Sequence, residues 1–332
     1  MAETSNIAKM ASQISDDLFS EFFWTKVGPT DVNWPCEDPA HHGVTTHPAD
    51  VVFYYDEPYS KRRTYVHCDL KSYAATSISP GAIRGAVESL AKQVACAEKS
   101  ETWRKQYMHD TCTPDICGLL FVYNHDGEYD KSFASHLTSL KESQLPLPVG
   151  ARLFVLGPRD IFWLDNVRYE IRQMRGATGT NCLPPASRCK YFYPQLDGLA
   201  NVQPEIAKAA TLEMLTSPWI VLEYQREKPS GGRGFIVFYR KSGETEEEFM
   251  YLLDYMRHYD MLRHNTHVEI KSMETSPTGA ASFQKAAQRY LASFDQSAST
   301  TEFADIVLAI KYSKMTQVKS QFSTVDVGMD YA

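Results

Sequence analysis

The sequence predicts an α/β fold, with a central mixed sheet flanked by helices and a C-terminal α+β unit after it. Strand-like and helix-like segments alternate over residues 10–160, which is typical of a sheet covered by helices. Residues 116–124 are almost continuously apolar, as expected of a strand buried on both faces. With 332 residues, of which 43% are hydrophobic, the chain can build one large domain or two ordinary ones.

The elements of the first part follow from local patterns. Ile14, Leu18 and Phe22 recur at four-residue spacing and indicate an amphipathic helix. Runs of β-branched and aromatic residues around a polar turn predict a strand pair, and Ser79 followed by Pro80 is typical of a helix start. We expect helices at 7–25, 81–99 and 130–142, strands at 51–55, 64–71, 116–124 and 152–157, and a strand-to-helix element at 161–174.

The second part begins after a stretch rich in Gly, Pro, Cys and Ser at 176–190, which predicts a boundary. We therefore expect one domain over 1–195 and a second, α+β domain over 196–332. No internal repeat is visible in the sequence. In the second domain we expect helices at 204–216, 244–263 and 279–294 and strands at 219–225, 234–240, 267–273 and 304–312.

Charge and cysteine usage narrow the class of protein. The net charge is −7, whereas a protein that relies on non-specific phosphate contacts is usually basic. The seven cysteines show no disulfide-framework spacing, which indicates reduced thiols. The chain has no secretory signal pattern and no apolar run near the roughly 18 residues of a membrane span. We expect a soluble, cytoplasmic protein with no membrane association.

An acidic pair with a lysine is the strongest chemical feature. Asp50 precedes the first strand of the pair, and Asp69 and Lys71 lie on the second strand at i and i+2, so both point to one face while Leu70 points into the core. Two carboxylates can hold a divalent metal such as Mg²⁺, with the Leu70 carbonyl as a third ligand. Lys71 can hold the attacking water or offset developing charge, and Glu21 on the first helix can orient a metal-bound water.

These residues resemble a known family. Pro48-Ala49-Asp50 followed by Asp69-Leu70-Lys71 is similar to the signature of the PD-(D/E)XK, or restriction-endonuclease-like, nuclease superfamily, apart from the inserted Ala49. The resemblance covers about residues 10–160 and implies an αβββαβ core. It assigns Asp50 and Asp69 as the motif's acids and Lys71 as its lysine. Glu21 matches the acid of the N-terminal helix, and Gln93 matches a glutamine that some branches carry on the following helix.

The resemblance implies a metal-dependent DNA endonuclease that uses Mg²⁺, with Mn²⁺ as a substitute. It also suggests bacterial anti-phage defence, DNA as a partner and a homo- or hetero-oligomer with a second protein subunit. The C-terminal domain would then serve oligomerisation, partner binding or DNA positioning. Further candidates for substrate contact are His67, which shares the face of Asp69, and the basic turn Lys61, Arg62 and Arg63.

Several alternatives compete with this interpretation. A second acid-x-lysine triplet, Glu269-Ile270-Lys271, lacks an upstream strand that ends in Asp. The acid cluster can be a solvated ion cluster at a sheet edge, or the chain can be a scaffold that keeps a nuclease fold while a partner supplies activity. Zinc-binding residue types crowd one loop, but no pair has zinc-finger spacing, so loop histidines near a polar cleft are the preferred interpretation. These residues are Cys36, His41, His42 and His47, with His67 and Cys68 on the nearby strand.

Overall fold

A computed structural model describes residues 2–108, 112–138, 140, 145–178, 182–195, 206–226, 231–274, 276–294, 298–316 and 318. The chain divides into two compact units. The first contains the residues up to Leu164, and the second contains most of the residues from Asp165 to Val318. Among the described helices, none is both long and apolar enough to cross a membrane.

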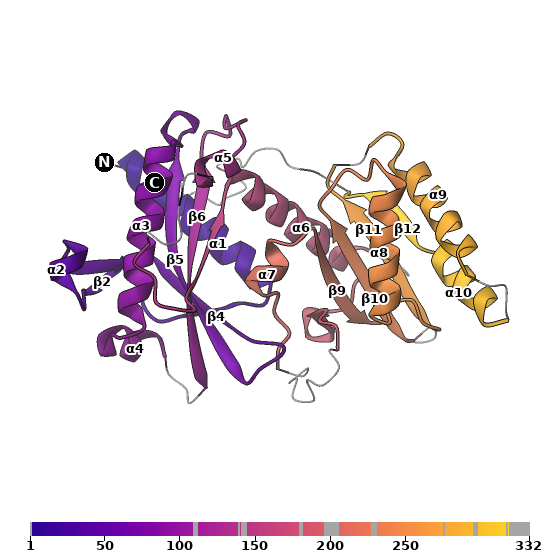
Figure 1. Ribbon diagram of the computed structural model, residues 1–332, viewed down its shortest axis with the longest axis horizontal. Coiled ribbons are helices and arrows are strands. Elements are labelled where there is room, and N and C mark those ends of the chain that lie inside the picture. The colour runs from indigo at the N-terminus through magenta and orange to yellow at the C-terminus, as the bar shows by residue number, and fades with distance from the viewer. Residues whose placement is uncertain are drawn as a thin grey trace. The chain divides into compact units, whose positions relative to one another are not determined.

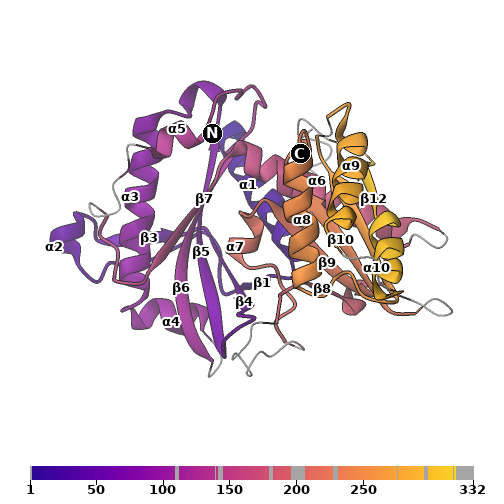
Figure 2. The same cartoon turned by 45° about the vertical axis from the view of Figure 1, so that its right-hand side comes forward.

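The first unit is built on a five-stranded mixed sheet (Figures 1 and 2). Its strands, in spatial order, are β1 (Thr25–Val27), β4 (Val51–Asp56), β5 (Arg62–Tyr73), β6 (Thr113–Asn124) and β7 (Arg152–Leu156). β1, β4 and β5 are antiparallel neighbours, whereas β5, β6 and β7 run parallel. This arrangement confirms the predicted central mixed sheet.

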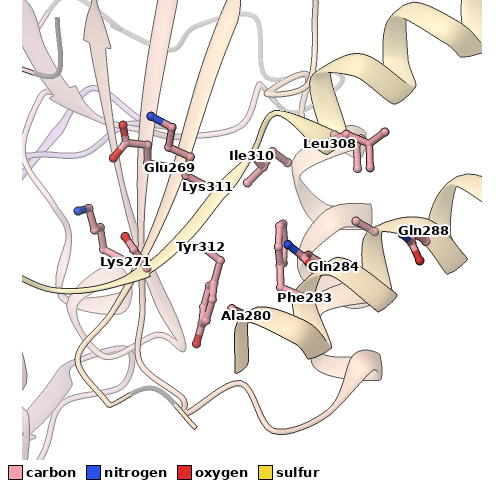
Figure 3. Close-up of a pocket in the computed structure, with 13 residues that line it drawn as sticks. Glu269, Lys271, Ala280, Phe283, Gln284, Gln288, Leu308, Ile310, Lys311 and Tyr312 are labelled. Atoms are coloured by element: carbon pink, nitrogen blue, oxygen red, sulfur yellow. The ribbon is translucent and has the colours of Figure 1, made fainter. Parts of the chain in front are cut away.

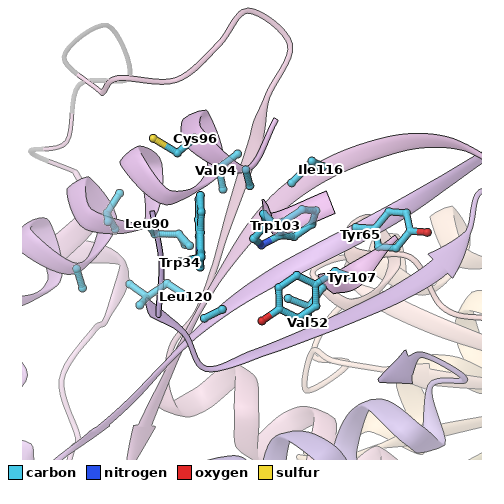
Figure 4. Packing of buried hydrophobic residues seen from close by; sticks show 14 of the residues in the cluster. Trp34, Val52, Tyr65, Leu90, Val94, Cys96, Trp103, Tyr107, Ile116 and Leu120 are labelled. Carbon is cyan, nitrogen blue, oxygen red and sulfur yellow. The ribbon is translucent and has the colours of Figure 1, made fainter. Parts of the chain in front are cut away.

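Helices cover both faces of this sheet. On one face α1 (Ala2–Glu21) packs Phe19 against Phe53 and Phe121, with ring centroids 5.2 and 6.0 Å apart. The other face carries α3 (Pro80–Ala97), α4 (Glu101–Tyr107) and a small hairpin of β2 (Val32–Pro35) and β3 (Thr46–Ala49), with α2 (Pro39–His42) between its strands. Their apolar core contains Trp34, Trp103 and Tyr107, each fully buried (Figure 4).

Local signals explain where these elements begin. The Ser79 hydroxyl accepts a hydrogen bond from the Ala82 amide, and Pro80 is the first residue of α3, as predicted. The order α1, β1, β4, β5, α3, β6 is the expected αβββαβ core. A short 3₁₀ turn (Ala75–Ser77) joins β5 to α3, and α5 (Ala134–Leu137) lies between β6 and β7.

The second unit contains its own five-stranded sheet. Its strands, in spatial order, are β8 (Cys189–Tyr191), β9 (Trp219–Gln225), β10 (Arg233–Tyr239), β11 (Thr266–Ser272) and β12 (Lys311–Lys314). The helices associated with the sheet are α7 (Leu212–Leu215), α8 (Glu246–His258), α9 (Gly279–Ala292) and α10 (Ala298–Leu308). The helix α6 (Pro158–Gly176) and a 3₁₀ turn (Ala186–Arg188) precede β8.

The two sheets share one connectivity, which the sequence did not reveal. In the second sheet β8, β9 and β10 are antiparallel neighbours, and β10, β11 and β12 run parallel. A helix precedes each sheet (α1 or α6), and a long helix joins each third strand to its fourth (α3 or α8). The expectation of no internal repeat therefore holds only for the sequence, because the topology is repeated.

Some predicted elements differ from the structure. Residues 304–312, expected as a strand, form the end of α10 and the start of β12, because a β-prone run can also pack as a buried helix turn. The helix predicted at 204–216 is only α7 within the described residues, and that at 130–142 is only α5; residues 139 and 141–144 lie outside them. The strands β1, β2, β3, β8 and the helix α4 were not predicted.

Candidate active site

Asp50 lies between β3 and β4, at the point where the pairing of β4 with β5 ends. Val51, the first residue of β4, pairs with Cys68 of β5. Two residues further along β5, the Leu70 amide donates a 2.7 Å hydrogen bond to the Asp50 carboxylate. Burial raises the pKa of Asp50 to about 6; the Leu70 amide opposes the rise, and the nearby Asp69 charge adds to it. Asp50 is thus a carboxyl that ionises close to neutral pH.

Asp69 and Lys71 lie on the same face of β5, two residues apart. The Lys71 ammonium donates a 2.5 Å hydrogen bond to Asp69 Oδ1. Asp69 is 2% exposed, and its other oxygen, Oδ2, is buried with no hydrogen-bond partner among the described residues. Burial lowers the pKa of Lys71, but the attraction of Asp69 and Asp50 outweighs it, so the net direction is upward. The lysine therefore stays charged at neutral pH.

The donor set fits a divalent metal. A buried carboxylate oxygen without a partner costs free energy, and a bound cation removes that cost. The Leu70 carbonyl points to the same side as its amide, because both groups of one residue in a strand point the same way, so it faces Asp50. Leu70 itself is half-buried, not a core residue as expected. Oxygen ligands of this kind are those that Mg²⁺ and Mn²⁺ prefer.

A third acid, Asp31, belongs to this cluster and was missed in the sequence. Asp31 adds a charge that raises the pKa of Asp50. Its amide donates a 3.1 Å hydrogen bond to the Asp50 carbonyl, and its φ of 53° places it in the left-handed region, where Asp is one of the tolerated residues. Asp31 lies in the loop rich in Pro, Asp and His, where no pattern separates it from other turn residues.

The other predicted site residues occupy different positions. Glu21 is the last residue of α1, which covers the sheet face opposite to that of Asp69 and Lys71, and it is 7% exposed. His67 is fully buried; its Nδ1 accepts a hydrogen bond from the Trp103 indole and its Nε2 lies 2.8 Å from Gln93 Oε1. This network joins α3, α4 and β5 beneath the acid cluster, and burial lowers the pKa of His67.

The basic turn lies at the other end of the β4–β5 hairpin. Arg63 and Asp69 are six positions apart on β5, a span of about 20 Å. Arg63 hydrogen-bonds Asp56 at 2.8 Å and stacks over the Tyr54 ring, and Arg62 lies 3.7 Å from Asp115. Lys61 is exposed. The acid cluster and the turn are thus separate features of one hairpin.

The second acid-x-lysine triplet occupies a different position in its sheet. Glu269 and Lys271 lie on β11, the fourth strand, and line a pocket of about 770 Å³ bounded by α9, α10 and β12 (Figure 3). Lys271 is 3.2 Å from Glu170, a fully buried carboxylate on α6. Glu170 also accepts hydrogen bonds from the Thr316 amide and hydroxyl, at 2.6 and 3.1 Å. These charges satisfy one another.

The repeated topology allows a direct comparison of positions. Val51 pairs with Cys68 in the first sheet, and Trp219 pairs with Tyr239 in the second. Trp219 and Tyr239 both pack against α8, the helix that joins the third strand to the fourth, and Asp69 lies on the face of the first sheet that the corresponding helix α3 covers. Within the described residues, this end of the second hairpin therefore carries aromatic side chains on that face where the first hairpin carries carboxylates.

Residues 1–160 match the model of a PD-(D/E)XK nuclease domain, which agrees with the mixed sheet and the acid–lysine cluster of the first unit. The particular family whose model matches these residues is the GAPS4 protein PD-(D/E)XK nuclease domain. The resemblance seen in the sequence is confirmed. No curated protein and no solved structure matched the chain. Nucleases of this superfamily generally use divalent metal ions.

Proposed function

We propose that the chain is a Mg²⁺-dependent DNA endonuclease that hydrolyses phosphodiester bonds, with Mn²⁺ as a substitute. The observation that carries this proposal is the buried Oδ2 of Asp69, which has no hydrogen-bond partner in the part of the chain that the structure describes and lies beside Asp50 and Lys71. Asp50, Asp69 and the Leu70 carbonyl would hold the metal, which when bound supplies Lewis-acid stabilisation and a more acidic water. The expected setting is bacterial anti-phage defence in the cytoplasm, as part of a complex.

The chain's own residues contribute position and charge. Lys71, kept charged by Asp69, can donate to the attacking water or to a phosphate oxygen and stabilise the added negative charge. Asp50 can act as a ligand only when ionised, so its raised pKa makes metal binding depend on pH near 6. Glu21 remains a predicted water-orienting residue. The basic turn, about 20 Å away, can contact the DNA backbone beyond the cleavage point.

The test is cleavage of supercoiled plasmid in Mg²⁺. Lys71→Ala should lower the rate by about 10²-fold or more, because an ammonium at developing charge is lost. A matched control is Lys105→Ala, which removes an exposed lysine from α4 and should leave the rate unchanged. Wild-type cleavage that persists in EDTA, or that survives Lys71→Ala at full rate, would overturn the proposal.

A scaffold role is the second candidate function, favoured by the net charge of −7 and by the aromatic side chains at the corresponding end of the second hairpin. In it, residues 196–332 would serve oligomerisation, partner binding or DNA positioning, and a partner subunit would supply activity. Titration calorimetry with Mn²⁺ separates the two. The nuclease should bind Mn²⁺ in a way that Asp69→Asn abolishes, whereas a scaffold should show no carboxylate-dependent binding.

A further inference from the structure

Four zinc-binding side chains from distant parts of the first unit meet in one place. They are Cys36 at the end of β2, His42 at the end of α2, His47 in β3 and Cys96 in α3. One ligand atom from each lies within 4.8 Å of all the others. Three of them are within 12 residues of sequence, but Cys96 comes from the next long helix, so no spacing motif could identify the set.

The distances match a tetrahedral metal site. Cys36 Sγ and Cys96 Sγ are 3.7 Å apart, and His42 Nδ1 is 3.3 Å from each sulfur. With Zn–S bonds of about 2.3 Å, the edge of a tetrahedron between two sulfurs is about 3.8 Å. A disulfide needs about 2.0 Å between its sulfurs, so the two thiols are not positioned as a bridge.

His47 points to a missing partner. It is 3% exposed, and its Nε2 is buried without a hydrogen-bond partner among the described residues. Its ring lies against Trp34, with centroids 5.1 Å apart, and 5.7 Å from the His42 ring. A buried imidazole nitrogen without a partner is destabilising, and a metal bond would satisfy it.

The surroundings suit a thiolate ligand. The Glu37 amide donates to Cys96 Sγ at 3.4 Å, which favours the charged form of the sulfur. Cys36 and Cys96 are 7% and 2% exposed and belong to the same buried apolar cluster as Trp34. Figure 4 shows Cys96 and Trp34 in this cluster. A divalent metal deprotonates a coordinating thiol, which offsets the cost of burying it.

We propose that Cys36, His42, His47 and Cys96 form a structural Zn²⁺ site. Two thiolates and two imidazoles in a tetrahedral arrangement select zinc, and four protein ligands leave no open position for a substrate. The site is separate from the acid cluster, and the proposal does not depend on the nuclease activity.

The zinc would connect the β2–β3 hairpin to α3. The Lys92 ammonium of α3 already donates to the His42 carbonyl at 2.9 Å along the same contact. His47 lies three residues before Asp50, so the metal would hold the end of β3 from which Asp50 projects. α3 also carries Gln93, the hydrogen-bond partner of His67 on β5. The bound metal thus acts as a positioning element.

The test measures metal in the full chain, purified under reducing conditions without chelators. Elemental analysis should find about one zinc per chain in the wild type. His42→Ala and Cys96→Ser should lose most of it. The matched control is His41→Ala, the neighbouring histidine, which is 83% exposed and bonds Asp38. His41→Ala and Asp69→Asn should keep the zinc, and the latter separates this site from the acid cluster.

Measurements on the wild type keep the test valid if a variant fails to fold. X-ray absorption at the zinc edge should show sulfur at about 2.3 Å and nitrogen at about 2.0 Å. Replacement by Co²⁺ should give the visible bands of a tetrahedral site with thiolates. Removal of zinc with a chelator should lower Tm by several degrees. The proposal is overturned by a wild type that holds no zinc after reconstitution, by an iron–sulfur spectrum, by a Cys36–Cys96 disulfide, or by zinc that persists in His42→Ala and Cys96→Ser.

Discussion

The two sheets of this protein have the same connectivity, but the buried carboxylates of the two units differ in how they are paired. In the first unit, Asp69 keeps one oxygen without a hydrogen-bond partner among the residues that the structure describes, and Asp50 has a raised pKa. In the second unit, Glu170 is fully buried but receives two hydrogen bonds from Thr316 and an ion pair from Lys271. A buried charge without a partner costs free energy, so such a charge persists where a bound ligand pairs with it. The comparison teaches that chemistry depends on the site and not on the topology.

A related contrast concerns another buried carboxylate of the second sheet. Glu223 is 3% exposed and lies 2.8 Å from Arg233 and 3.5 Å from Lys190. Both of its cationic partners come from neighbouring strands of the same sheet. Glu223 thus joins three neighbouring strands, whereas the acids of the first unit lie together at a strand end.

The largest expected effect is on the rate of DNA cleavage. It tests whether only the first acid-x-lysine triplet, Asp69-Leu70-Lys71, is catalytic. Asp69→Asn should lower the rate of plasmid cleavage by about 10³-fold or more, because a metal ligand is lost. Glu269→Gln, the equivalent change in the second triplet, should change it by less than about threefold. Rates for both variants at saturating Mg²⁺ check this, and equal losses would show that the second triplet is also catalytic.

The second effect concerns the stability of the second unit. Lys271→Met should lower the free energy of unfolding by about 3–5 kcal/mol, because it leaves the buried Glu170 charge without its cation. The control Lys285→Met removes an exposed lysine from α9 and should stay within about 0.5 kcal/mol. Urea unfolding followed by tryptophan fluorescence measures both. A small loss at Lys271 would mean that Thr316 alone satisfies Glu170.

The third effect is also on stability, but in the first unit, and here the substitution should raise the free energy of unfolding. A carboxyl whose pKa rises from 3.8 to about 6 on folding contributes stability that is present below about pH 4 and lost as the pH rises through 6. Asp50→Asn cannot ionise, so it should stabilise the metal-free protein at pH 8 by up to about 3 kcal/mol and have little effect at pH 4. Thermal unfolding in EDTA at the two pH values checks the sign. A variant that is less stable than the wild type at pH 8 would contradict the expectation.

The smallest effect is on metal affinity. Because Asp50 must be ionised to bind a cation, the affinity for Mn²⁺ should fall about tenfold for each pH unit below about 6 and level off above it. Calorimetric titrations between pH 5 and pH 8 measure this. The slope should disappear in Asp50→Asn, and a slope that persists there would assign the proton to another group.

The acid cluster was predictable because its parts are local. Asp69 and Lys71 are two residues apart on one strand, and Asp50 starts the neighbouring strand of the same hairpin, so strand geometry alone brings them together. Asp31 and Cys96 were not predictable in their roles. Asp31 reaches Asp50 through a left-handed loop residue, and Cys96 meets Cys36 only after α3 packs on the sheet.

The sequence by itself determined the mixed sheet flanked by helices and the neighbouring positions of Asp50, Asp69 and Lys71, since local patterns and the alternation of strand side chains specify them, and its resemblance to the PD-(D/E)XK superfamily implied the αβββαβ core. Only the tertiary structure decided that the second sheet repeats the first, that the aromatic residues Trp219 and Tyr239 lie paired at the end of its hairpin, and that two cysteines and two histidines converge. The physical reason is that strand pairing and helix packing join residues far apart in the chain, and no local pattern records such contacts.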